Sequence, residues 1–150
     1  MCGIAGAFAW GRNSPVDPAS LHSMSDAMPH RGPDDEGLFI DPSGALGFSF
    51  RRLSIVDLSP AGHQPMSSEE DRFTLVLNGE IYNHLELREG LVARGHRFIG
   101  RSDAEAALHL VEEAGAGAIA KLHGKFAVAV WDRDRESLLI ARDRLGVKPV

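Results

Sequence analysis

The chain has 150 residues, with 16 Lys and Arg against 21 Asp and Glu, so its formal net charge is −5. This length is typical of one compact domain, and 43% hydrophobic with 25% charged residues is typical of globular proteins. The acidic balance, without a Lys/Arg cluster, argues against a nucleic-acid partner. No apolar run reaches the roughly 20 residues of a membrane span. We therefore expect a cytoplasmic protein with no membrane partner.

The first half of the chain predicts one helix followed by strands. Residues 17–28 form the expected helix, with Asp17 as its cap and Pro18 at its first helical position. Large and small side chains alternate over residues 45–50, which is the period of a β-strand with one bulky face. A further strand is expected to begin at Phe73.

The second half predicts two helices and a hairpin. The first helix covers residues 83–94 with Asn83 as its cap, and the second begins with the capping box Ser102–Glu105. Two apolar runs, 126–131 and 138–141, are joined by a charged turn, as in a hairpin. This order favours a mixed α and β domain with largely antiparallel strands. Strands with one small and one large face suit two stacked sheets.

Several cofactor motifs are absent or misplaced. The glycine-rich run Gly115–Ala120 follows a predicted helix, whereas a dinucleotide-binding turn follows a strand. The seven histidines include no i, i+4 pair, and one cysteine forms neither an internal disulfide nor the usual structural zinc site. We expect no metal site and no cofactor in this chain.

Cys2 is the residue whose side chain most clearly suggests a chemical reaction. Removal of Met1 would place a thiol and a free α-amine on Cys2. An amine with a pKa of about 7.7 to 8.0 can accept the proton of a thiol with a pKa of about 8.5, which creates a nucleophile with its own base. The alternative is that Cys2 is only a small residue beside a first strand, and position alone favours that alternative.

Seven short motifs, in a fixed order, change this balance. They are Met1–Gly6, Arg31–Asp34, Arg52–Leu58, Gly62–Met66, Asn78–Asn83, Ser102–Glu105 and Ala141–Gly146. Together they resemble the glutaminase domain of glutamine-hydrolysing asparagine synthetase, a class II glutamine amidotransferase. The resemblance implies the N-terminal-nucleophile hydrolase fold, an α+β four-layer sandwich of two stacked, mainly antiparallel sheets flanked by helices. It covers residues 1–150 as one glutaminase domain, which we expect to be truncated at its C-terminal end.

The resemblance implies a reaction for Cys2. Its thiol attacks the side-chain amide of L-glutamine, releases ammonia and leaves a thioester that water hydrolyses to glutamate. The Asn78 side chain and the Gly79 N–H then form the oxyanion hole, because fixed donors stabilise the charge that develops there. The alternative for Asn78-Gly79 is a two-residue hairpin turn, a common use of this dipeptide.

Further residues acquire substrate-binding roles through the resemblance. Arg52 is expected to bind the α-carboxylate of glutamine, since a guanidinium offers two parallel donors. Glu80 and Asp103 are expected near the α-ammonium group. The alternatives are a surface charge for Arg52 and a favourable interaction with the helix dipole for Asp103. Arg31–Asp34 is expected to order a loop and to take no chemical step.

Residues 1–150 contain no pyrophosphate-binding loop of the Ser-Gly-Gly type, so we expect them not to include the synthetase domain of the family. We therefore expect ATP and magnesium to bind only to the synthetase domain. The expected partners of this chain are L-glutamine and a synthetase domain or subunit that accepts the ammonia. Two alternatives stay open. One is a non-catalytic or regulatory module of the same fold, which retained Met1 would favour, and the other is an amidotransferase that feeds another acceptor. The oligomeric state, a homodimer included, also stays open.

Overall fold

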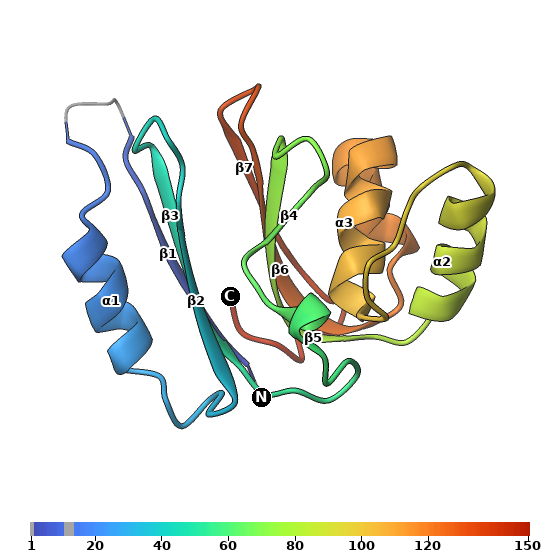
Figure 1. Ribbon diagram of the computed structural model, residues 1–150, viewed down its shortest axis with the longest axis horizontal. Coiled ribbons are helices and arrows are strands. Elements are labelled where there is room, and N and C mark those ends of the chain that lie inside the picture. The colour runs from blue at the N-terminus through green and yellow to red at the C-terminus, as the bar shows by residue number, and fades with distance from the viewer. Residues whose placement is uncertain (1, 11–13) are drawn as a thin grey trace.

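Two antiparallel sheets stack face to face in the computed structural model, which describes residues 2–10 and 14–150, and helices cover both outer faces (Figure 1). One sheet has the order β1-β3-β2 and the other β4-β5-β6-β7. The strands are β1 Gly3–Phe8, β2 Asp35–Ile40, β3 Leu46–Arg52, β4 Met66–Ser67, β5 Phe73–Ile81, β6 Gly124–Asp132 and β7 Ser137–Arg142. The helices are α1 Pro18–Asp26, α2 His84–Ala93 and α3 Asp103–Ala114, with short 3₁₀ helices at Pro60–Gly62 and Gly115–Lys121. The predicted four-layer α+β sandwich is confirmed.

The helix α1 begins as predicted, because Asp17 accepts hydrogen bonds from Ala19 N at 3.1 Å and Ser20 N at 3.2 Å. It ends at Asp26, two residues before the predicted end. Its Leu21 is fully buried against β3, where a Cβ on Gly47 would come within 2.4 Å of the Leu21 side chain. The small face of β3 therefore admits the helix.

The large face of β3 supplies the contact between the two sheets. Phe48 and Phe50 pack with Val76, Ala129 and Trp131 of the second sheet in one buried cluster. The alternation of large and small residues along β3 indicated two stacked sheets, and the structure adds that the small face of the strand packs against α1.

The helix caps of the second half agree with the sequence only in part. Asn83 makes no cap hydrogen bond to α2, because its side chain bridges Lys121 O and His123 N instead. At α3, Ser102 Oγ accepts from Glu105 N as in a capping box. The Glu105 carboxylate accepts instead from the N–H groups of residues 99 and 100, so the reciprocal half of the box is wrong. The predicted hairpin is confirmed as β6–β7.

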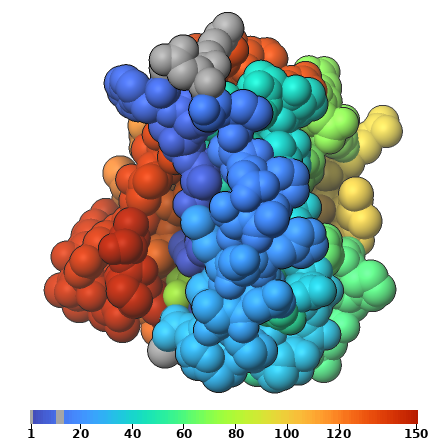
Figure 2. All heavy atoms as spheres, turned by 90° about the vertical axis from the view of Figure 1, so that its left-hand side faces the viewer, coloured from blue at the N-terminus to red at the C-terminus, as the bar shows by residue number. Residues whose placement is uncertain are grey.

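The edge strands β1 and β7 border an apolar pocket of about 580 Å³ that also includes the last two residues, 149 and 150. Seen from the α1 side, the C-terminal segment lies beside β1 (Figure 2). Among the residues that the structure describes, no helix is long and apolar enough to cross a membrane.

A buried hydrogen bond also joins the sheets, and it supports a stability prediction. Trp131 Nε1 donates to Asp41 Oδ1 at 2.8 Å. We expect Trp131→Phe to lower the free energy of unfolding by about 1–3 kcal/mol, because the buried Asp41 carboxylate loses a donor. Urea denaturation measures the change. The control Trp10→Phe alters a side chain that is 89% exposed and should shift the midpoint little. Equal midpoints for the two variants would contradict the prediction.

Candidate active site

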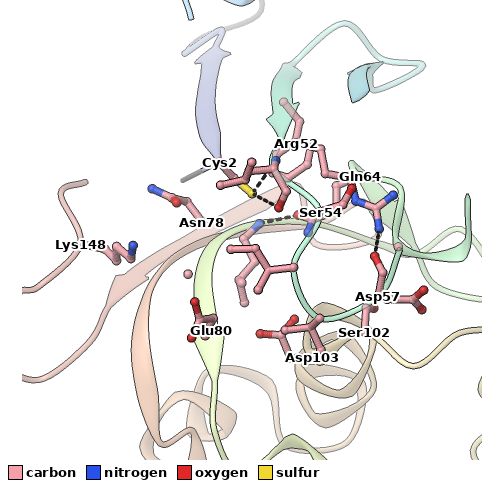
Figure 3. A pocket seen from close by; sticks show the side chains of 17 residues that line it. Cys2, Arg52, Ser54, Asp57, Gln64, Asn78, Glu80, Ser102, Asp103 and Lys148 are labelled. Atoms are coloured by element: carbon pink, nitrogen blue, oxygen red, sulfur yellow. Dashed lines mark hydrogen bonds between the residues drawn. The ribbon is translucent and has the colours of Figure 1, made fainter. Parts of the chain in front are cut away.

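One pocket at the ends of the central strands contains all six residues for which the sequence predicted chemistry (Figure 3). They come from the residue before β1, the ends of β3 and β5, and the first turn of α3, and they are Cys2, Arg52, Asn78, Gly79, Glu80 and Asp103. The fold thus brings together side chains that lie far apart in the sequence.

Cys2 immediately precedes β1 and is half-buried in this pocket. Its Sγ accepts from Leu53 N at 3.4 Å and lies 3.6 Å from Leu53 O, to which the thiol can donate. The Arg31 guanidinium donates to the Cys2 carbonyl at 3.2 and 3.4 Å. Cys2 is therefore held in place from two sides. Met1, whose removal would free the Cys2 α-amine, lies outside the described part of the chain.

The motif Arg31–Asp34 has the structural role that the sequence predicted. A Cβ on Gly32 would lie 2.4 Å from the backbone of Arg51, so the loop packs directly on β3. Asp34 accepts from Ser54 N at 2.8 Å, in the loop that follows β3. The motif thus positions both Cys2 and the loop above it.

Asn78 and Gly79 lie within β5, opposite Ala127 and Phe126 of β6, so the hairpin-turn alternative is wrong. Gly79 has φ +154°, and a Cβ there would lie only 2.0 Å from Lys125 O. Only glycine therefore fits this position.

The Asn78 side chain is 3% exposed, and its amide oxygen has no hydrogen-bond partner among the described residues. A buried polar atom without a partner costs about 1–3 kcal/mol. The two ends of the amide exchange by rotation, so the group can offer either an acceptor or a donor. Such a site is suited to a ligand with polar atoms.

Arg52 is 7% exposed, which excludes the surface-charge alternative. Its guanidinium donates to Ser59 O at 3.1 Å and to Asp57 O, and it lies 3.9 Å from the Asp35 carboxylate. Gly62 packs against the same group. Arg52 therefore holds the loop after β3 to the pocket, and its binding of a substrate carboxylate stays a prediction.

The two predicted acids differ in environment. Asp103 is 6% exposed, accepts from Ile81 N at 2.8 Å, and has a pKa above its ordinary value because burial outweighs its hydrogen bonds. Glu80 pairs with Lys125, with 3.5 Å between Oε2 and Nζ. Of the two predicted acids, Asp103 is thus a buried carboxylate and Glu80 is already paired with a lysine.

Sequence reasoning missed two further pocket residues. Gln64 accepts from Leu77 N at 2.7 Å, beside Asn78. Lys148 is 5% exposed, and its backbone N–H donates to Asp143 at 3.0 Å. Asp143 also accepts from three other backbone N–H groups, which hold its pKa low and fix the C-terminal loop. The motif Ala141–Gly146 is one of the seven that carry the resemblance, but the turn that it builds cannot be read from its residues alone.

Residues 1–150 match the family of glutamine amidotransferase domains. The chain belongs to this family. The amidotransferase domain is 42% identical over 152 residues to asparagine synthetase [glutamine-hydrolyzing] 2 of Bacillus subtilis, with 100% of this chain and 20% of the relative covered. It is 39% identical over 155 residues to asparagine synthetase 1 of the same organism, covering 100% and 24%. Amidase chry2 of Gibberella zeae is 39% identical over 128 residues, covering 85% and 19%.

This amidotransferase domain therefore spans about a fifth to a quarter of the length of these curated relatives. A solved structure of glutamine phosphoribosylpyrophosphate amidotransferase from Bacillus subtilis, complexed with ADP and GMP, aligns with a TM-score of 0.69. The alignment covers 95% of this chain and 37% of that one at 17% identity. At that identity the likeness supports the fold alone, and it agrees with the predicted amidotransferase sandwich.

Proposed function

We propose that this domain hydrolyses the side-chain amide of L-glutamine at Cys2 and supplies the ammonia for asparagine synthesis. The observation that carries the proposal is the convergence of six sequence-predicted residues, from four separate segments of the chain, on one pocket around the Cys2 thiol. The synthetase domain or subunit that binds ATP and magnesium lies outside this chain. The amide hydrolysis needs no cofactor here, because a thiol, an amine and backbone donors supply its chemistry.

The reaction begins with Cys2 after Met1 has been removed. The α-amine of Cys2 takes the thiol proton, and Sγ attacks the amide carbon of glutamine. The Asn78 amide and the Gly79 N–H stabilise the negative charge on the former carbonyl oxygen. The proton passes to the leaving nitrogen, the C–N bond breaks, and ammonia departs from a thioester. Water then attacks the thioester, giving glutamate and restoring the thiol.

Substrate binding uses two buried charged side chains that line the same pocket. Arg52 offers its guanidinium to the α-carboxylate, and Asp103 offers a buried carboxylate to the α-ammonium group. Burial disfavours an isolated charge, so an arriving cation stabilises the ionised form of Asp103. The location we propose is the cytoplasm, where a free thiol such as Cys2 stays reduced.

Asp103 gives the site a pH dependence. Its pKa is raised by burial, so as the pH falls through that raised value the carboxyl gains a proton and loses its attraction for the ammonium group. We expect the KM for glutamine to rise on this acid side and to be flat above it. Asp103→Asn should raise KM at every pH and remove the rise of KM at low pH. Measurements of KM against pH for both proteins test this, because the Cys2 α-amine acts on the chemical step and not on substrate binding. A rise of KM at low pH that is equally large in the variant would contradict it.

The direct test of the function is a glutaminase assay on the purified chain lacking Met1. We expect glutamate and ammonia in equal amounts from L-glutamine and much less product from L-asparagine. Glutamine binding without product formation would favour a non-catalytic module instead. Because amidase chry2 matches at similar identity, the ammonia acceptor is tested separately, by adding a synthetase partner with ATP, magnesium and aspartate.

A further inference from the structure

Two histidines and a glutamate converge on a pocket that shares no lining residue with the active site. His96 lies in the loop after α2, and His109 and Glu112 lie one turn apart on α3. Nδ1 of His96 is 3.2 Å from Nδ1 of His109, which is 2.6 Å from Glu112 Oε2. The third separation, His96 Nδ1 to Glu112 Oε2, is 3.7 Å. Three potential ligand atoms therefore form a compact triangle.

Outer hydrogen bonds orient the histidine rings. His96 Nε2 lies 3.1 Å from Glu113 Oε1, and the Arg94 guanidinium holds that carboxylate at 2.7 and 3.0 Å. A carboxylate at Nε2 keeps the ring proton there and leaves the Nδ1 lone pair directed at the triangle. The His109 ring has its own hydrogen bond to the backbone of Arg97. Metal-ligating histidines typically have such partners on the other ring nitrogen.

We propose that His96, His109 and Glu112 bind a first-row divalent transition metal ion, with Zn²⁺ as the best-matched candidate. Metal–ligand bonds of about 2.0–2.2 Å place tetrahedral ligands about 3.3–3.6 Å apart, which is close to the separations in the triangle. The 2.6 Å contact between His109 and Glu112 opens by about 1 Å or less when an ion replaces a shared proton. Two imidazole nitrogens and one carboxylate form a donor set that suits zinc better than it suits magnesium or calcium.

The surroundings of the triangle leave space for further ligands. The pocket there has a volume of about 330 Å³ and is also lined by Glu69 and Glu70 from the β4–β5 connection. Water or one of these carboxylates can occupy the remaining coordination position. An ion here would tie the loop after α2 to α3, so its expected role is structural. The proposal is independent of glutamine hydrolysis.

The alternative explanation of the triangle is that shared protons, without a metal ion, hold His96, His109 and Glu112 together. A proton on His109 Nδ1 can be shared with Glu112 and His96, which produces the same arrangement without an ion. The two accounts differ in what they predict for metal binding. Only a metal site binds one ion per chain and loses that ion when one of the three donor atoms is removed.

Zinc titration by calorimetry distinguishes them. We expect one Zn²⁺ per chain for the wild-type protein, with a raised Tm in its presence. His96→Gln and Glu112→Gln should both abolish this binding while keeping the wild-type circular dichroism spectrum. His123→Gln, a histidine outside the triangle, is the matched control and should bind zinc as the wild type does. Equal zinc binding by all four proteins, or none by the wild type, would overturn the proposal.

Two further measurements test which side chains hold the ion. Co²⁺ bound in place of zinc should give visible bands of a tetrahedral site without a thiolate charge-transfer band, since Cys2 is the one thiol and is not a proposed ligand. A thiolate band would overturn the assignment. Glu113→Gln removes only the outer partner of His96, and we expect it to weaken zinc binding by about 10- to 100-fold. Unchanged affinity in this variant would contradict the proposed role of Glu113.

Discussion

Replacing Cys2 with alanine is expected to abolish glutamine hydrolysis and leave the fold intact. The loss in kcat should be about 10⁴-fold or more, because the variant has no atom that can form the thioester. The side chain is half-buried at the margin of the core between the sheets, and its hydrogen bonds involve only the backbone of Leu53, so truncation to alanine removes one sulfur atom from that margin and should leave the fold intact. Glutamate release at saturating glutamine measures the rate, and a urea denaturation midpoint measures the fold.

Cys2→Ser is the matched variant for this experiment. It keeps a small polar side chain beside Leu53 but replaces the thiol with a hydroxyl of far higher pKa. We expect it to bind glutamine and to turn it over very slowly. If either variant hydrolysed glutamine at a rate near that of the wild type, the nucleophile would have to be another residue.

The second large effect is expected at Asn78. Asn78→Ala removes one donor of the proposed oxyanion hole, so kcat should fall about 10²- to 10³-fold while KM changes little. The amide oxygen of Asn78 has no hydrogen-bond partner among the described residues. Its removal therefore breaks no hydrogen bond of that oxygen within the protein. Steady-state kinetics on the variant separate kcat from KM.

Asn83→Ala provides the control for the change at Asn78. Asn83 follows β5 by two residues, and its side chain bridges two backbone groups before β6, so this variant should lose stability rather than kcat. A fall in kcat of the same size in both variants would indicate a general disturbance of β5. An Asn78→Ala enzyme with wild-type kcat would remove the residue from the reaction.

Local signals predicted the elements whose structure depends on local contacts. Asp17 caps α1 because a side chain and two neighbouring N–H groups suffice for that bond. The alternation along residues 45–50 indicated both faces of β3, because the period of a strand fixes which side chains share a face. The motifs of the glutaminase domain identified the six pocket residues, although none of them lies close to all the others in sequence.

Tertiary contacts decided the features that the sequence could not reveal. The dipeptide Asn78-Gly79 also suits a tight turn, but pairing with β6 keeps it extended. Asn83 has the residue type of a cap, yet its amide finds better-placed partners in the segment before β6. Lys148 reaches the pocket only because Asp143 gathers four backbone N–H groups into a turn.

The His96, His109 and Glu112 triangle escapes sequence reasoning for the same reason. Spacing rules for metal sites describe histidines one helical turn apart, whereas one of these ligands comes from a loop. His96 and His109 are 13 residues apart in the sequence, and they meet only because the loop after α2 packs against α3. No spacing rule describes such a pair.

Whether Cys2 is the nucleophile is tested by the intact mass of the purified protein, followed by labelling with the glutamine-like electrophile 6-diazo-5-oxo-norleucine. We predict loss of Met1 and a single adduct on Cys2, mapped by peptide mass spectrometry and blocked by excess glutamine. An adduct on another residue, or no adduct on a chain that has lost Met1, would contradict the account of Cys2 as the nucleophile.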